Sequence, residues 1–170
     1  MPMKVVYRLA DELASDPKQV ALAQQLTLDA SRPYMGLKGT HGLFGSEEWW
    51  KSVERGLIQK WRVSGIIRRA FVAGQDPEEP INAVDIQLES GEMVTEGIYA
   101  TDSRDQALFA VGHQMDIVYV LDELKAPVRG DGRSHADIPL EVSVSSEPVE
   151  QPRVRDRLAR WLPTLRRGSR

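Results

Sequence analysis

The first sixty residues have the hydrophobic spacing of helices. In residues 3–14, apolar side chains recur at intervals of three and four positions, which predicts a helix. Asp16 and Pro17 then form a typical helix start, because aspartate caps free N–H groups and proline has none to lose at the first helical position. A second helix is predicted from there to about residue 30, and the two helices are expected to form a hairpin.

A third, shorter helix is predicted between Ser46, a good N-cap, and Gly56, a natural stop. A helix of this length is not stable in water by itself, so it must dock on the rest of the chain. Trp49 and Trp50 lie on the same arc of it as Val53. Truncation of a buried tryptophan costs about 3–5 kcal/mol, so we interpret the pair as interior residues that seal a core, not as an exposed ligand platform.

From residue 61 the pattern changes from helical to alternating, which predicts β-strands. The first strand is long and is expected to bend at Gly65. Pro139 confines the last strand to a sheet edge or to a strand start. The predicted strands cover residues 61–72, 83–89, 92–100, 115–121 and 138–146, with a short helix at 101–112.

This order, β-β-β-α-β-β, is typical of a small Greek-key barrel. The predicted fold class is α+β: a five-stranded antiparallel OB-like (alternatively SH3-like) β-barrel with N-terminal helices and a C-terminal amphipathic helix. Residues 1–60 form the predicted helical N-terminal segment packing on the barrel. Residues 61–146 form the β-barrel domain, and residues 147–170 form a basic amphipathic C-terminal helix or tail.

Composition narrows the function classes. The 170 residues include no cysteine, which excludes a disulfide scaffold, thiol catalysis and cysteine-ligated metal. The N-terminus lacks the apolar region of a signal peptide, and no apolar run approaches the ~20 residues that cross a bilayer. We therefore expect a cytoplasmic protein.

The charge is distributed unevenly. Residues 151–170 contain seven arginines and one acid, a charge of +6, whereas the first 150 residues carry −9. Arginines surround an apolar stripe in this C-terminal segment, so it is predicted to pack on this chain or on a second copy, or else to bind nucleic acid or an anionic membrane surface. The candidate interaction residues are Arg153, Arg157, Arg160, Trp161, Leu165 and Arg166.

No motif for catalysis, metal binding or cofactor binding is found, so no such site residues and no cofactor are predicted. The three histidines share no metal-ligand spacing and are expected to be scattered surface residues. They are His41, His113 and His135. The loop at 129–137 brings Ser134, His135 and Asp137 together, but neighbours on one glycine-rich loop are not held at attack geometry.

Two of the three outward residues of the predicted 83–89 strand, Asp85 and Glu89, are acidic, which disfavours phosphate binding on the barrel face. Arg68 and Arg69 are expected to pair with these acids across the sheet. The predicted function is therefore a non-catalytic protein-interaction module with a protein partner or self-association. The alternative is a nucleic-acid or anionic membrane-surface binder acting through the arginine-rich C-terminal helix, and an enzyme built on the 129–137 loop ranks last.

Overall fold

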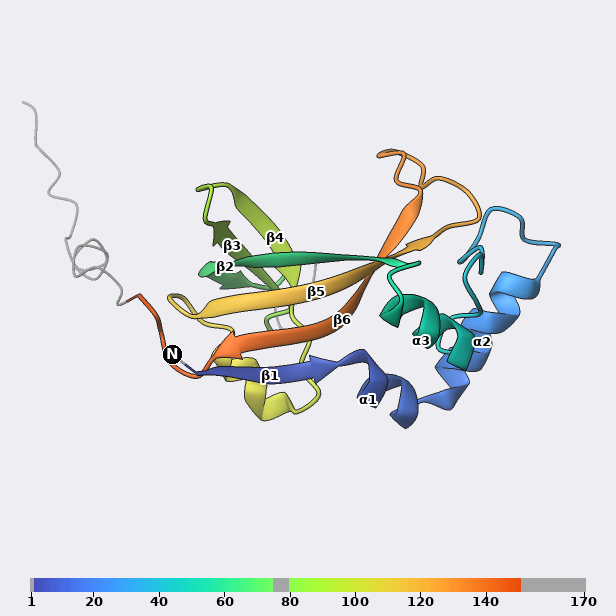
Figure 1. The fold of residues 1–170 in the computed structure, drawn as a ribbon. Helices are drawn as coiled ribbons and strands as arrows, with labels where there is room; N and C mark the ends of the chain where they lie inside the picture. Colours follow the sequence, from blue (N-terminus) through green and yellow to red (C-terminus); the bar gives the residue numbers. More distant parts are fainter. Residues whose placement is uncertain (1, 75–79, 151–170) are drawn as a thin grey trace, which may run out of the picture.

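The computed structural model describes residues 2–74 and 80–150 of the chain. Within this part, the strands form a six-stranded antiparallel sheet in the order β1-β6-β5-β2-β3-β4, with β1 and β4 at its edges (Figure 1). The strands are β1 (Met3–Arg8), β2 (Gln59–Phe71), β3 (Ala83–Leu88), β4 (Met93–Gly97), β5 (Gln114–Glu123) and β6 (His135–Ser145). The helices are α1 (Leu9–Ser15), α2 (Pro17–Leu28), α3 (Glu47–Glu54) and the 3-10 helix η1 (Ser103–Leu108).

The predicted five-stranded barrel is wrong. The sheet has one strand more and is not closed, because β1 and β4 do not pair with each other. The additional strand, β1, occupies the first half of a segment predicted to be helical, and only α1 in its second half is a helix. A short apolar run does not distinguish the two states by spacing, and the valines together with pairing to β6 favour a strand here.

The five strands expected from residue 61 onward are all present, with ends that differ by a few residues. The short helix expected between the third and fourth of them is η1. The predicted C-terminal amphipathic helix lies in residues 151–170, outside the described residues. The division of the chain at residues 60 and 146 stays a prediction.

Gly65 is needed where β2 meets β3. A Cβ atom at this position would lie 2.5 Å from the backbone oxygen of Gln87, so only glycine allows the two strands to approach this closely. The β2–β3 register shifts further along, between Ile67 and Arg69. The bend expected at Gly65 stays a prediction.

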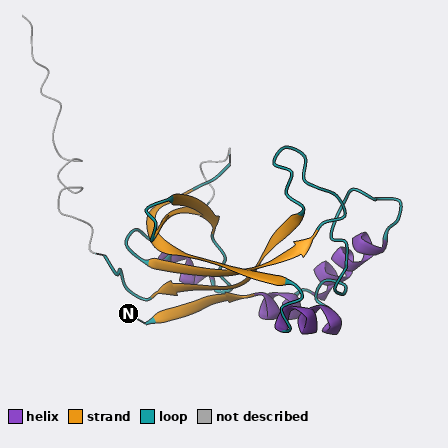
Figure 2. Cartoon of the chain, turned by 45° about the horizontal axis from the view of Figure 1, so that its top comes forward, coloured by secondary structure: helices purple, strands orange, loops and turns teal. Residues whose placement is uncertain are grey.

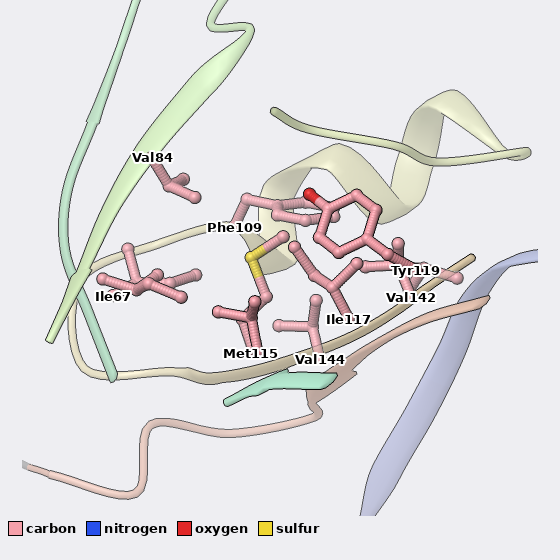
Figure 3. Close-up of a cluster of buried hydrophobic side chains, with 11 residues drawn as sticks. Ile67, Val84, Phe109, Met115, Ile117, Tyr119, Val142 and Val144 are labelled. Atoms are coloured by element: carbon pink, nitrogen blue, oxygen red, sulfur yellow. The ribbon is translucent and has the colours of Figure 1, made fainter. Parts of the chain in front are cut away.

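The main core lies on one face of the sheet. Inward side chains of β2, β3, β5 and β6 meet there, and Phe109, which follows η1, closes over them (Figure 3). The labelled side chains of this cluster are Ile67, Val84, Phe109, Met115, Ile117, Tyr119, Val142 and Val144. Strict alternation along β5 therefore leaves its other side chains for the opposite face, which we term the outer face.

A second core forms where α3 docks at one end of the sheet, beside α1 and α2 (Figures 1 and 2). Trp49 is fully buried there and packs with Val53 and Val120. Its Nε1 donates a hydrogen bond of 2.8 Å to the buried carboxylate of Asp122. The predicted interior position is confirmed for Trp49, whereas Trp50 is only half-buried.

Candidate functional site

The outer face of the sheet is covered by α3 at its Val120 end and is partly exposed from Val118 to Gln114. Asp116 lies near its centre and accepts hydrogen bonds from Arg62 (2.5 Å), Ser64 (2.5 Å) and Gln114 (3.3 Å). Burial alone would raise the pKa of Asp116, but these hydrogen bonds outweigh it and the pKa falls below its ordinary value of 3.8. The carboxylate is therefore ionised at neutral pH and holds its neighbours in place.

A groove of about 480 Å³ lies between α1, α3 and this face. Its apolar lining includes Trp50, Val118 and Leu140. Leu140 is the bulged residue of β6, because Val118 pairs with Glu141 and Tyr119 already pairs with Pro139. The complete lining is Arg8, Ala10, Trp50, Val53, Glu54, Lys60, Val118, Leu140 and Glu141.

Four charged side chains surround the groove. Arg8 and Glu141 form an ion pair of 3.3 Å across β1 and β6. The side chains of Lys60 and Glu54 are exposed and form no ion pair with another described residue. The groove therefore offers one positive and one negative group to a partner, beside an apolar floor.

Trp50 packs against the second core in this groove. Its ring stands edge-to-face on buried Trp49, with the ring centroids 4.9 Å apart. Protein-binding surfaces are enriched in tryptophan and arginine around a desolvated apolar centre, which is the composition found here. The arrangement can bind an apolar side chain of a partner protein and fix the charges beside it.

The loop at 129–137 does not assemble a Ser-His-Asp triad. Ser134 Oγ lies 2.9 Å from His135 Nδ1, but the carboxylate of Asp131 pairs with Arg133 at 2.7 Å. The side chains of these residues are exposed. Arg133 also approaches Asp137 at 3.9 Å, so the acids of this loop are engaged with arginine and not with the histidine.

The expected surface position is wrong for His113. Its ring is buried, and its Nδ1 forms a 2.7 Å hydrogen bond with the backbone oxygen of Ser145. Across residues 2–74 and 80–150, the structure contains no group of three or more histidine or carboxylate side chains that could hold a metal ion. In the same ranges, every helix is too short or too polar to cross a bilayer.

The predicted pairing of the β2 arginines with acids across the sheet is confirmed for Arg69 and is wrong for Arg68, whose ion pair is with Glu150. Arg69 forms an ion pair of 2.7 Å with Asp85, and Arg68 donates to Gln87 at 2.9 Å. The six interaction residues predicted in the C-terminal segment lie outside the described residues, so their role stays a prediction. They are Arg153, Arg157, Arg160, Trp161, Leu165 and Arg166.

The groove could not be predicted from the sequence. Its charged residues come from β1, α3, β2 and β6, and no spacing along the chain brings these segments together before the sheet is known. The only sign of the groove in the sequence is Trp50. Only one of two adjacent helical tryptophans can point straight into a core, so the other must lie nearer the surface.

Comparison with curated proteins finds no match for the chain. The model of a protein family described as "Immunity protein RhsI2" matches residues 3–145. The match runs from β1 to the end of β6 and so includes the whole sheet and every residue of the groove. An immunity protein binds and neutralises a toxin, so the match shows a protein-binding role and a protein partner, and gives no support to nucleic-acid or membrane binding. The chain belongs to the RhsI2 immunity protein family.

Proposed function

We propose that this protein neutralises a toxin by binding to it directly and without catalysis, and that the groove beside Trp50 is part of the contact surface. The observation that supports the proposal best is the family match, which spans the whole sheet. The groove supports it further, because an apolar hollow surrounded by charged side chains suits an anchor side chain of a partner protein.

The groove is suited to binding because it is already formed. Trp50 packs edge-to-face on Trp49, and Arg8 is paired with Glu141. Side chains that are ordered before association lose little conformational entropy when the partner arrives, so more of the contact energy contributes to affinity. Lys60 and Glu54 then select a toxin surface that presents an acid and a base at matching positions.

We place this encounter in the cytoplasm, as the sequence predicts. The experiment begins with the tagged full chain and a toxin that copurifies with it and inhibits growth when produced alone. The dissociation constant of the pair is measured by calorimetry, and growth protection is measured by coproduction of the two proteins.

Val118→Arg places a charge on the floor of the groove. Val118 is on the outer face, so the substitution leaves the inward neighbours Ile117 and Tyr119 in place. Binding is expected to weaken by roughly 30-fold or more, the effect of losing an interface hot spot, and growth protection should fall with it. Val111→Arg is the matched control, because Val111 is 50% exposed and does not line the groove. Equal binding by the two variants would exclude the groove from the contact surface, and a chain that binds no toxin would refute the proposal as a whole.

A further inference from the structure

The two edges of the sheet differ in how their backbone groups are paired. At β1, the backbone oxygen of Val6 accepts a hydrogen bond of 2.9 Å from the N–H of Thr101. Tyr7 adds a ring contact with Tyr99, at 5.6 Å between centroids. The segment that follows β4 therefore crosses the β1 edge and covers part of it.

The hydrogen bonds of the β3–β4 hairpin show which backbone groups of β4 point away from the sheet. Leu88 N–H donates to Glu92, and Ile98 N–H donates to Asn82. In an antiparallel pair, bonded and non-bonded positions alternate, so Val94 and Glu96 face β3. The intervening residues, Met93, Thr95 and Gly97, direct their N–H and C=O groups to the free edge.

This outward edge is unpaired in the part of the chain that the structure describes. No hydrogen bond reaches the outward backbone groups of Met93 or Thr95. At the far end, the Tyr99 ring lies close to Gly97, so the open stretch extends from Glu92 to Glu96. An open edge of this kind is a template for pairing with another extended chain.

Acids predominate beside this edge. The described residues 80–103 contain five acids and no lysine or arginine. Within the hairpin, Asp85 pairs with Arg69, and Glu96 accepts a hydrogen bond from the Tyr119 hydroxyl. The carboxylates of Glu89 and Glu92 form no ion pair with a described residue. They therefore repel acidic chains and attract basic ones.

We propose that the β4 edge binds an extended, basic segment of the toxin, which adds to the sheet as a further strand. The N–H and C=O groups of Met93 and Thr95 pair with the backbone of that segment, and its lysine or arginine side chains meet Glu89 and Glu92. The identity of the partner as a toxin rests on the proposed function. The chemistry of the segment rests on the edge and its charge alone.

The test uses the full chain labelled with ¹⁵N and a synthetic peptide of alternating lysine and valine. Backbone hydrogen exchange is followed by NMR with and without the peptide. At a peptide concentration about ten times its dissociation constant, the Met93 and Thr95 amides should exchange about tenfold more slowly, because only the unbound fraction exchanges. A peptide of alternating glutamate and valine is the charge control and should give no protection.

Thr95→Pro removes the outward N–H group and keeps every backbone hydrogen bond between β3 and β4, since proline is tolerated on an edge strand. Thr95→Val is the matched control, because both variants lose the 2.6 Å hydrogen bond from the Thr95 hydroxyl to Asp85 and only the proline loses the amide. The peptide should bind to the valine variant and lose binding to the proline variant.

Three results would overturn the inference: no protection by the basic peptide, equal protection by the acidic peptide, or equal binding by the two Thr95 variants. Protection that rises with the concentration of the chain alone would assign the edge to a second copy and would also overturn it. None of these results involves the toxin, so they leave the proposed function standing. A failure of toxin neutralisation leaves the peptide result standing in turn.

Discussion

The helix-covered end of the sheet and the β3–β4 hairpin use their polar groups in opposite ways. At the helix-covered end, the buried Asp122 is paired with Trp49. The edge strand β1, which packs on the main core, is tied to Thr101. At the hairpin, the backbone of Met93 and Thr95 faces outward and the neighbouring acids are exposed. The difference indicates that the first region stabilises the fold and the second is available to a partner, because unpaired edges and unpaired charges add nothing to folding.

Trp49→Ala should have the largest effect on the stability of the fold. Trp49 is fully buried, so its removal leaves a cavity and an unpaired carboxylate, and the free energy of unfolding should fall by about 3–5 kcal/mol. Chemical denaturation measures the change. Trp61→Ala is the control, because Trp61 is 50% exposed, and it should cost less than about 1 kcal/mol. Equal losses would show that α3 does not seal a core.

Gly65→Ala should lower the free energy of unfolding by a smaller amount, because it disturbs the contact between β2 and β3. The added methyl group would lie 2.5 Å from the backbone oxygen of Gln87, so β2 and β3 must move apart. Overpacking of this kind costs about 1–3 kcal/mol, measured by the same denaturation. No loss of stability would mean that the two strands are less closely joined than the structure shows.

The free energy of unfolding should depend on pH through the protonation of Asp122. Burial raises the pKa of Asp122 above its ordinary value of 3.8, and the Trp49 hydrogen bond only partly offsets this. The folded chain thus holds this proton more tightly than the unfolded chain, so the stability that the protonated group contributes is lost as the pH rises through the folded pKa. Asp122→Asn does not titrate, so its stability relative to the original chain should improve as the pH rises above the ordinary pKa of 3.8. A constant or opposite difference across denaturation curves would contradict the assignment.

The smallest expected effect is a difference in hydrogen-exchange rate between single backbone amides. It distinguishes the β4 edge of the sheet from the β1 edge. In the free chain, the Met93 and Thr95 amides should exchange rapidly, because they face outward, while the Val94 and Glu96 amides are protected by β3. The Thr101 amide should also be protected, since it is bonded to Val6 at the β1 edge. Uniform protection along β4 would show that its edge is already occupied.

The strands after residue 60 could be predicted because their signals are local. Alternation along β3 and the glycine turn after it are visible in the sequence, and so is the need for a docked Trp49. The number and order of strands could not be predicted, since β1 reaches β6 across more than a hundred residues and no local pattern records that pairing. The groove depends on the same long-range pairing, because it brings Arg8 beside Glu141.

For a related reason, the sequence does not predict which N–H and C=O groups of β4 point away from the sheet. It depends on which positions of the hairpin are hydrogen-bonded, and this follows from the turn at Gly91 and the register with β3. The acidity of the 83–89 strand was visible in the sequence. It was interpreted as a surface that disfavours phosphate, and the open strand beside it became clear only from the register.

Titration of a fixed amount of the growth-inhibiting toxin with the full chain tests most directly whether this protein acts by binding. If the protein acts by binding, toxin activity falls in proportion to the chain added and vanishes near equimolar amounts, and the two proteins elute as one complex in size-exclusion chromatography. Loss of activity at far smaller amounts of the chain, with no complex formed, would contradict it, because that result requires a catalytic turnover that binding cannot produce.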